Sequence, residues 1–298
     1  MDVFGGIEAG GTKFVCGIGT GPDDLETVSM PTAAPEESLP RAVEFFRTAA
    51  GHRLSAIGIA CFGPIELDCK SPTFGEITTT PKRAWRNVNI VQAMAQALPV
   101  PVAFETDVNA AALAEAEWGA ARGIEDCVYF TVGTGIGGGV VVGGRPVHGL
   151  LHPEIGHLRI SQREDDRFAG SCPFHGNCLE GLASGPALTA RWGCAPETLP
   201  STHPAWEMEA HYLAVAVSTV LYTLSTHRII LGGGVMQQAV LFPMIRRNVR
   251  QILNGYIDKP QVNEAIDQYI VPPRLGRQSG VLGALLLARR AFDASVQE

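Results

Sequence analysis

Two imidazoles and two thiols occur close together along one stretch of the sequence, between Glu154 and Glu180. The set comprises His157, Cys172, His175 and Cys178, which are the ligand types and the number that a closed tetrahedral zinc site uses. The spacing Cys-x₂-His-x₂-Cys, with Pro173 and Gly176 in a stretch without apolar periodicity, offers little to bury and much to coordinate. We therefore interpret this stretch as a loop organised by structural zinc.

The alternative for each of these residues alone is an ordinary buried thiol or a satisfied histidine, which is the commoner role. Four such residues together favour the metal. His157 stands far from the other three in sequence, and Asp165 or Asp166 is an alternative oxygen ligand in its place. Glu154 and Glu180 flank the set, so a metal that gathers the ligands also draws these two carboxylates towards each other. The stretch is therefore expected to carry polar groups to a site.

Composition narrows the class of protein. The 298 residues, 46% hydrophobic and 18% charged, suffice for one large or two modest domains, and we expect two lobes. The net charge of −7, without a basic run, argues against nucleic acid or a membrane as the main partner and favours small molecules. No leader pattern and no long apolar run occur, and the seven cysteines fit a reducing compartment, so we expect a cytoplasmic protein.

Paired glycines between short apolar runs predict hairpins in both halves of the chain. The first has strands at residues 2–9 and 14–19 around Gly10-Gly11-Thr12. The same pattern returns as a strand at 127–132, a glycine-rich turn at 133–138, a strand at 139–142 and a turn at Gly143-Gly144. This repetition predicts a duplicated α/β unit.

The segment between the hairpins is expected to alternate helices and strands. We expect an amphipathic helix that follows Pro35 and Glu36 and ends near Ala50, and a buried strand at 56–62 that is stopped by Gly63-Pro64. Residues 63–86 are too broken by proline and glycine for a regular element and indicate a functional loop.

A helix capped by Asn87 is expected next, with one apolar face formed by Val88, Val91, Ala95 and Leu98. A strand at 100–105 and a helix at 107–121 follow. Thr106-Asp107 therefore lies where a strand passes into a helix, the edge at which ligands bind in α/β sheets.

The last third of the chain is predicted to be mainly helical. Helices are expected at about 179–192, 205–225, 235–254 and 280–292, with a strand at 228–231 and a third glycine cluster at 232–234. The C-terminal helix is expected to pack back on the N-terminal lobe.

The glycine clusters allow more than one reading. Gly133-x-Gly135-x-x-Gly138 formally matches the dinucleotide fingerprint, but a strand rather than a helix follows it, so we reject that reading, and no P-loop motif is present. Glycine turns expose backbone N–H groups that can approach phosphate oxygens, although one such turn alone is better explained by chain geometry. Clusters at 10–11, 133–139 and 232–234 together favour binding of the β-phosphate, the γ-phosphate and the adenosine of a nucleotide.

Several segments, in order along the chain, resemble the ROK family of sugar kinases. They are Glu8-Ala-Gly-Gly-Thr-Lys13, Thr106-Asp-Val-Asn-Ala-Ala111, Gly133-Thr-Gly-Ile-Gly-Gly-Gly139, Glu154-Ile-Gly-His157 and the segment from Cys172 to Gly181. Within the family, the opening IEAGGTKF, CPFHGNCLEGLASGPA and TPKRAWRNVNI most resemble bacterial ATP-dependent fructokinases. The resemblance implies an α/β, duplicated actin-like or ribonuclease-H-like fold with two lobes around a central cleft, Mg²⁺ and ATP as cofactors, structural Zn²⁺ and a homodimer.

We expect the chain to divide into two lobes, with residues 1–106 and a C-terminal helix at about 275–298 in the smaller lobe. Residues 107–274, including the zinc loop at 154–181, form the larger lobe.

The resemblance also implies roles for single residues. Asp107 matches the catalytic base. The expected sugar-binding residues are Glu154, His157 and Glu180, with Gly63 and Pro64 from the loop at 63–87. The expected ATP-binding residues are Gly10, Gly11, Thr12 and Lys13 in a first phosphate motif, Gly133, Thr134, Gly135 and Gly137 in a second, and Gly233 and Gly234.

The chain departs from the family pattern at two of these positions. Glu8 stands where the wider family often has aspartate, which bears on its link to magnesium, and Thr106 stands where asparagine is common. Glu105 is the alternative base, with a weaker claim because it is expected on the strand.

The reaction expected from these roles is phosphoryl transfer, in which Asp107 accepts the proton of a hexose hydroxyl as that hydroxyl attacks the γ-phosphate. The expected substrate is fructose, phosphorylated at O6. The alternatives are a kinase for glucose, mannose or N-acetylmannosamine, or a non-catalytic sugar-sensing protein of the same family.

Overall fold

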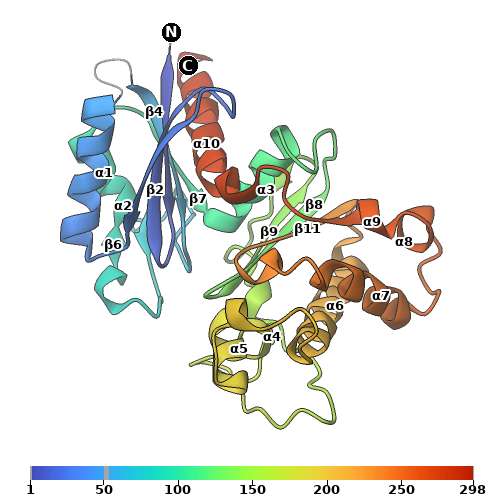
Figure 1. Cartoon of the computed structure of the whole chain (residues 1–298). Helices are drawn as coiled ribbons and strands as arrows, with labels where there is room; N and C mark the ends of the chain where they lie inside the picture. Colours follow the sequence, from blue (N-terminus) through green and yellow to red (C-terminus); the bar gives the residue numbers. More distant parts are fainter. Residues whose placement is uncertain (1, 50–53, 298) are drawn as a thin grey trace. The chain divides into compact units, whose positions relative to one another are not determined.

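The computed structural model describes residues 2–49 and 54–297, and the chain forms two compact units (Figure 1). Unit 1 holds the chain up to Gly119, the segment Arg145–His152 and the chain from Arg277 onwards. Unit 2 holds Ala120–Gly144 and Pro153–Gly276.

The sheet of unit 1 runs in the order β3-β2-β1-β4-β7. Its strands are β1 (Val3–Ala9), β2 (Lys13–Gly19), β3 (Glu26–Pro31), β4 (Leu54–Cys61) and β7 (Val102–Thr106). β1 and β2 form the predicted antiparallel hairpin, and β1, β4 and β7 are parallel. The edge strand β3 was not predicted, because its side chains are almost all exposed and leave no apolar alternation in the sequence.

Helices cover both faces of this sheet: α1 (Pro35–Ala49) and α2 (Ile90–Ala97) on one, α3 (Asp107–Glu117) and α10 (Ser279–Gln297) on the other (Figure 1). Between α1, α2 and the sheet lies the larger core cluster, which includes Phe14, Phe46 and Trp85. α10 approaches the strands closely, since a Cβ on Gly58 would lie 1.9 Å from the carbonyl oxygen of Ala284. The C-terminal helix thus packs on the N-terminal strands, as predicted.

The division into units differs from the predicted boundary after residue 106. α3 belongs to unit 1 because it packs along α10, where a Cβ on Gly283 would come within 2.1 Å of the Ala110 carbonyl oxygen. Residues 145–152 also belong to unit 1.

The stretch between β4 and β7 holds two errors of the sequence reading. The predicted irregular loop at 63–86 contains β5 (Glu76–Ile77), which pairs with β6 (Val88–Asn89), and the 3₁₀ turn η2 (Arg83–Trp85). The cap of α2 is Asn89, whose side chain accepts from the Gln92 N–H, whereas Asn87 adopts a left-handed φ of 59°. The buried face of α2 is accordingly formed by Ile90 and Met94 and continues to Leu98, and Ala95 is exposed. The predicted end of α1 at Ala50 lies outside the described residues.

Unit 2 repeats the arrangement of a hairpin beside parallel strands. β8 (Cys127–Val132) and β9 (Ile136–Val142) form the antiparallel hairpin, β11 (Arg228–Gly232) runs parallel to β8, and β12 (Ile270–Val271) runs parallel to β11. This repetition confirms the predicted duplicated α/β unit. The short strands β10 (Arg145–Pro146) and β12 were not predicted.

The remaining helices all lie in unit 2: α4 (Leu179–Ala183), α5 (Gly185–Trp192), α6 (Ala205–Leu224), α7 (Leu241–Leu253), α8 (Pro260–Asn263) and α9 (Ile266–Tyr269). The predicted helix at 179–192 is broken at Ser184, whose hydroxyl accepts from the Ala187 N–H and caps α5. The predicted helix at 235–254 is a 3₁₀ turn, η5 (Val235–Gln237), followed by α7. Within residues 2–49 and 54–297, no helix combines the length and apolar character of a membrane span.

Candidate functional site

The parallel strands of unit 1 end together at one edge of their sheet. The register places Ala9, Cys61 and Thr106, the last residues of β1, β4 and β7, side by side. The segments that follow these strands therefore meet at the carboxyl edge of the sheet. They are the Gly10-Gly11 turn, Gly63-Pro64 and Asp107.

The Gly10–Thr12 turn is held tightly from behind. The N–H of Gly10 donates to the Lys13 carbonyl at 2.9 Å, and the Thr32 hydroxyl donates to the Gly10 carbonyl at 2.7 Å. A Cβ at position 10 would lie 2.8 Å from the Lys13 carbonyl oxygen, so the turn requires glycine there. Thr12 and Lys13 are exposed, which leaves the outer side of the turn open to a ligand.

Asp107 is the first residue of α3, but it is not the cap of that helix. The cap is Thr106, whose hydroxyl accepts from the Asn109 N–H at 3.1 Å. The half-buried Asp107 carboxylate accepts from the Val108 N–H at 2.9 Å through Oδ1. Its charge adds to burial in raising the pKa of the Cys61 thiol, so the two side chains lie near each other. Capping therefore does not account for an aspartate at this position.

Glu105 is buried and engaged through both oxygens. Oε1 accepts from the Thr106 N–H at 2.8 Å and from the Asn109 side-chain amide at 3.0 Å, and Oε2 hydrogen-bonds His148 Nε2 at 2.7 Å. The bond to Glu105 raises the pKa of His148. Glu105 therefore fixes the junction between β7 and α3, and the sequence reading missed its partner His148.

A second histidine, His152, hydrogen-bonds the main chain just after Gly63-Pro64. His152 is buried, and its Nε2 accepts from the N–H of Ile65, next to Pro64, at 3.2 Å. His148 and His152 lie just before Glu154 in the sequence. Two histidines flanking Gly-Leu-Leu were the only sequence signal for these anchors.

Glu8 lies against the first turn of α10. Burial raises its pKa, Lys13 lowers it, and the Val281 N–H donates a hydrogen bond to it. A Cβ on Gly280 would fall 2.5 Å from the Glu8 Cδ, so any larger residue there would displace the Glu8 carboxylate. In the described part of the chain Glu8 Oε2 is buried without a hydrogen-bond partner. A hard cation such as Mg²⁺, or water bound to it, fits such an oxygen.

The glycine turns of unit 2 also gather at one sheet edge. β8 and β11 are parallel, with Thr131 opposite Gly232, so Gly133 and Gly233 follow neighbouring strands. Gly233 has φ 95°, and a Cβ there would lie 2.3 Å from the Val132 carbonyl oxygen. The N–H of Gly185, at the start of α5, donates to the Gly133 carbonyl at 2.8 Å. This brings the second glycine turn, the third glycine cluster and the start of α5 together.

The second glycine turn is shorter than predicted. It closes through the hydrogen bond from the Gly133 N–H to the Gly135 carbonyl, and Thr134 is exposed at its tip. Gly137 and Gly138 belong to β9, where they pair with Thr131 and Phe130. Gly234 lies next to the turn, since a Cβ on Gly133 would be 3.8 Å from its nitrogen.

Glu154 and Glu180 form a pair of acids in unit 2. Glu154 precedes the 3₁₀ turn η3 (Ile155–His157), and Glu180 is in the first turn of α4. Glu180 Oε2 accepts from the Ile136 N–H at 3.0 Å, directly after the second glycine turn. Burial, and then the negative charge of Glu180, raise the pKa of Glu154 to about 7.

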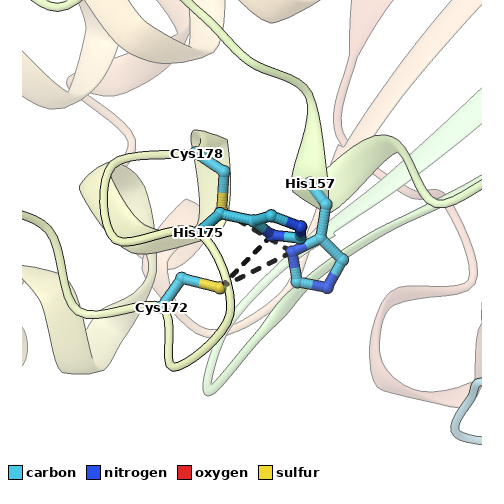
Figure 2. A group of neighbouring side chains, drawn as sticks. All are labelled: His157, Cys172, His175 and Cys178. Carbon is cyan, nitrogen blue, oxygen red and sulfur yellow. Dashed lines mark hydrogen bonds between the residues drawn. The ribbon is translucent and has the colours of Figure 1, made fainter. Parts of the chain in front are cut away.

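Figure 2 shows the predicted zinc ligands converging on one point. His157 Nδ1 lies 3.8 Å from Cys172 Sγ and 3.6 Å from Cys178 Sγ, and His175 Nδ1 lies 3.7 Å from Cys172 Sγ. Zinc bonds of about 2.3 Å to sulfur and about 2.1 Å to nitrogen, at the tetrahedral angle, set a nitrogen–sulfur separation of roughly 3.6 Å. Burial raises the pKa of the Cys178 thiol to about 11. The donor set fits Zn²⁺, which binds the thiolate form.

The two aspartates considered as alternative ligands have other partners. Asp165 pairs with Arg163 at 2.6 Å. Asp166 accepts from the Tyr212 hydroxyl at 2.5 Å and from Arg191 at 2.9 Å, which anchors the loop to α6 and α5. The cluster includes His157 instead, although it is distant in sequence from the other three ligands.

The fold and these sites define a class of protein, and comparison with known proteins agrees with it. The model of the ROK family matches residues 4–291, and the chain belongs to that family.

Similar proteins are known in several bacteria. The chain is 44% identical to the fructokinase of Zymomonas mobilis, over 97% of each chain, and 41% identical to the fructokinase of Pediococcus pentosaceus, over 97% of this chain and 99% of that one. The crystal structure of the ROK hexokinase from Thermus thermophilus superimposes with a TM-score of 0.76 at 29% identity, covering 98% of this chain and 99% of that one. The fold is thus the duplicated actin-like, ribonuclease-H-like α/β fold that the family resemblance implied.

Proposed function

We propose that this chain is an ATP-dependent sugar kinase that phosphorylates fructose at O6, giving fructose 6-phosphate. The observation that carries the proposal is the similarity, over nearly the full length, to proteins named fructokinase at more than 40% identity. The carboxyl edge of unit 1 supports it, because a glycine turn and the Asp107 carboxylate lie there together.

Asp107 is the proposed general base. Its carboxylate accepts the proton of the O6 hydroxyl as the oxygen attacks the γ-phosphorus, and the bond from that phosphorus to the leaving ADP oxygen breaks. Glu105, through its bonds to Thr106 and Asn109, holds the start of α3 so that Asp107 stays in position.

The glycine turns are the proposed nucleotide site. In unit 1 the proposed ATP-binding residues are Gly10, Gly11, Thr12 and Lys13, the first phosphate motif. In unit 2 they are Gly133, Thr134, Gly135 and Gly137, the second motif, together with Gly233 and Gly234. Backbone N–H groups without a neighbouring Cβ can approach phosphate oxygens closely. Mg²⁺, when bound, neutralises charge on those phosphates. Glu8, with its unpartnered buried oxygen, would hold the ion or its water.

Glu154, His157 and Glu180 are the proposed ligands of the sugar hydroxyls, with Gly63 and Pro64. The charge of a carboxylate acceptor strengthens a hydrogen bond from a hydroxyl. His157, Cys172, His175 and Cys178 would hold a structural zinc, because four protein ligands leave no position for an activated water. The zinc would fix the loop that leads into α4 and thereby the position of Glu180.

The test is release of ADP, measured with purified protein across a panel of hexoses, with the phosphorylated position of each product assigned by NMR. Fructose should give the highest kcat/KM and a product modified at O6. A preference for glucose, mannose or N-acetylmannosamine would replace fructose by that hexose. Absence of turnover with every hexose, together with tight sugar binding, would indicate a sugar-sensing protein. Light scattering on the same sample tests the homodimer that we propose from the family resemblance.

A further inference from the structure

We propose that Lys82 is a catalytic residue that contacts the phosphoryl group during its transfer. The inference rests on the proposed kinase function and concerns the same carboxyl edge of unit 1. Lys82 lies in the segment between β5 and β6, far from the first glycine turn in sequence. In space, a Cβ built on Gly11 would lie 3.5 Å from the Lys82 Cε, so the lysine stem extends across that turn.

An aromatic anchor fixes this segment next to the turn. Trp85 is 2% exposed, and its ring packs against Phe14 and Phe62 with centroid separations of 5.3 and 6.0 Å. Phe14 lies two residues after the glycine turn, and Phe62 directly follows β4. The Trp85 indole N–H also donates to the Ala33 carbonyl at 3.0 Å. Lys82, three residues before Trp85, is therefore held close to the turn.

Hydrogen bonds restrain the backbone on the other side of Lys82. The Lys82 N–H donates to the hydroxyl of Thr80 at 3.3 Å, and the Arg86 guanidinium donates to the Thr80 carbonyl at 2.7 Å. Thr80 itself is buried, and the N–H of Thr78 donates to the Pro64 carbonyl at 2.8 Å. The main chain at Lys82 is thus positioned from both sides, and only the side chain is left to reach a ligand.

The ammonium group of Lys82 has no counter-ion in the structure. Among residues 2–49 and 54–297, no carboxylate forms an ion pair with it, although it is half-buried. Lys13, on the same turn, differs, since its charge lowers the pKa of Glu8. An unpaired cation beside exposed backbone N–H groups attracts an anion, and a lysine binds phosphate as a compact point charge.

Phosphoryl transfer creates the charge that this cation would stabilise. As the bond from the γ-phosphorus to the ADP oxygen breaks and the bond to the sugar oxygen forms, negative charge spreads over the phosphoryl oxygens and the leaving oxygen. The sugar proton passes to Asp107, and Lys82 stays protonated throughout. Removing one preorganised donor from such a site typically lowers kcat by about 10²–10³-fold.

The experiment compares Lys82→Met, which removes the charge and keeps the stem, with Lys82→Arg, which keeps the charge. Lys70→Met, at an exposed lysine of the same stretch, is the matched control. We expect Lys82→Met to lower kcat by about 10²-fold with little change in the KM for fructose, Lys82→Arg to recover part of the loss, and Lys70→Met to match wild type. A normal kcat in Lys82→Met, or equal losses in the Met and Arg variants with a matching fall in melting temperature, would overturn the proposal.

Calorimetry separates this inference from the proposed function. We expect Lys82→Met to bind a non-hydrolysable ATP analogue about tenfold more weakly than wild type and to bind ADP equally well, because only the analogue carries the terminal phosphate. If the wild-type protein turns over no hexose, the proposed function fails, and this comparison still decides the role of Lys82. Unchanged binding of the analogue, or an equal loss for both nucleotides, would refute the contact with the terminal phosphate.

Discussion

Replacing Asp107 with Asn separates catalysis from helix capping. The substitution keeps the shape of the side chain, and an amide oxygen can still accept the hydrogen bond that Asp107 Oδ1 takes from the Val108 N–H. The cap of α3 is Thr106 and is untouched. The free energy of unfolding should therefore change by less than about 1 kcal/mol, because the amide keeps the shape of the side chain and a carbonyl oxygen to accept hydrogen bonds.

The expected effect on turnover is much larger. Loss of a general base lowers kcat by roughly 10²–10⁴-fold, which corresponds to about 2.7–5.4 kcal/mol of the activation barrier. The KM for ATP should be nearly unchanged, because the glycine turns are intact. A large loss of kcat with a small loss of stability identifies a base, because replacing a merely structural residue would lower stability and activity together.

The measurements are kcat, KM and melting temperature on the same purified protein. Glu117→Gln is the matched control, because Glu117 lies in the last turn of the same helix and pairs with Arg289 at the other end from Asp107. The control should keep kcat and lose at most about 1 kcal/mol of stability. Near-normal turnover in Asp107→Asn would remove Asp107 from the mechanism, and Glu105→Gln would then be the next variant.

The further predictions concern the zinc loop and Glu154 in unit 2. Metal analysis should find about one zinc per chain. The Cys178→Ser variant should lose the metal and melt at a lower temperature than wild type. A metal-free variant with unchanged melting temperature and kinetics would exclude a structural zinc. Glu154→Gln should raise the KM for fructose and leave the KM for ATP unchanged, because an amide is a weaker acceptor. In the wild type that KM should rise as the pH falls through about 7, where Glu154 becomes protonated, and the variant should lack this dependence. The pKa of Glu154 is raised from 4.5 to about 7, so burial of its carboxyl group lowers the stability of the wild-type protein progressively as the pH rises through that window. The variant should therefore melt at a higher temperature than wild type above about pH 7, and at a similar temperature near pH 4. Equal melting curves at both pH values would contradict the raised pKa.

The sequence predicted those elements whose signals are local. Both hairpins were found because paired glycines separate two short apolar runs, and this pattern needs no knowledge of distant residues. β3 was not predicted, because its residues are exposed and its strand geometry comes only from pairing with β2. The start of α2 was misplaced because two asparagines compete for the cap. Asn87 and Asn89 look alike in sequence, and the pairing of β5 with β6 decides between them.

The same distinction explains which parts of the candidate site were found. Cysteine and histidine are uncommon residues, so Cys172, His175 and Cys178 at short spacing are informative on their own. Glu105 and His148 are separated by 43 positions, and nothing near either residue indicates the 2.7 Å contact. Lys82 reaches Gly11 because Trp85 is buried against Phe14 and Phe62, two rings from distant parts of the sequence. A lysine in an irregular segment is usually a solvated surface residue. The fixed position beside a glycine turn, which only the packed structure reveals, is what turns this one into a candidate for catalysis.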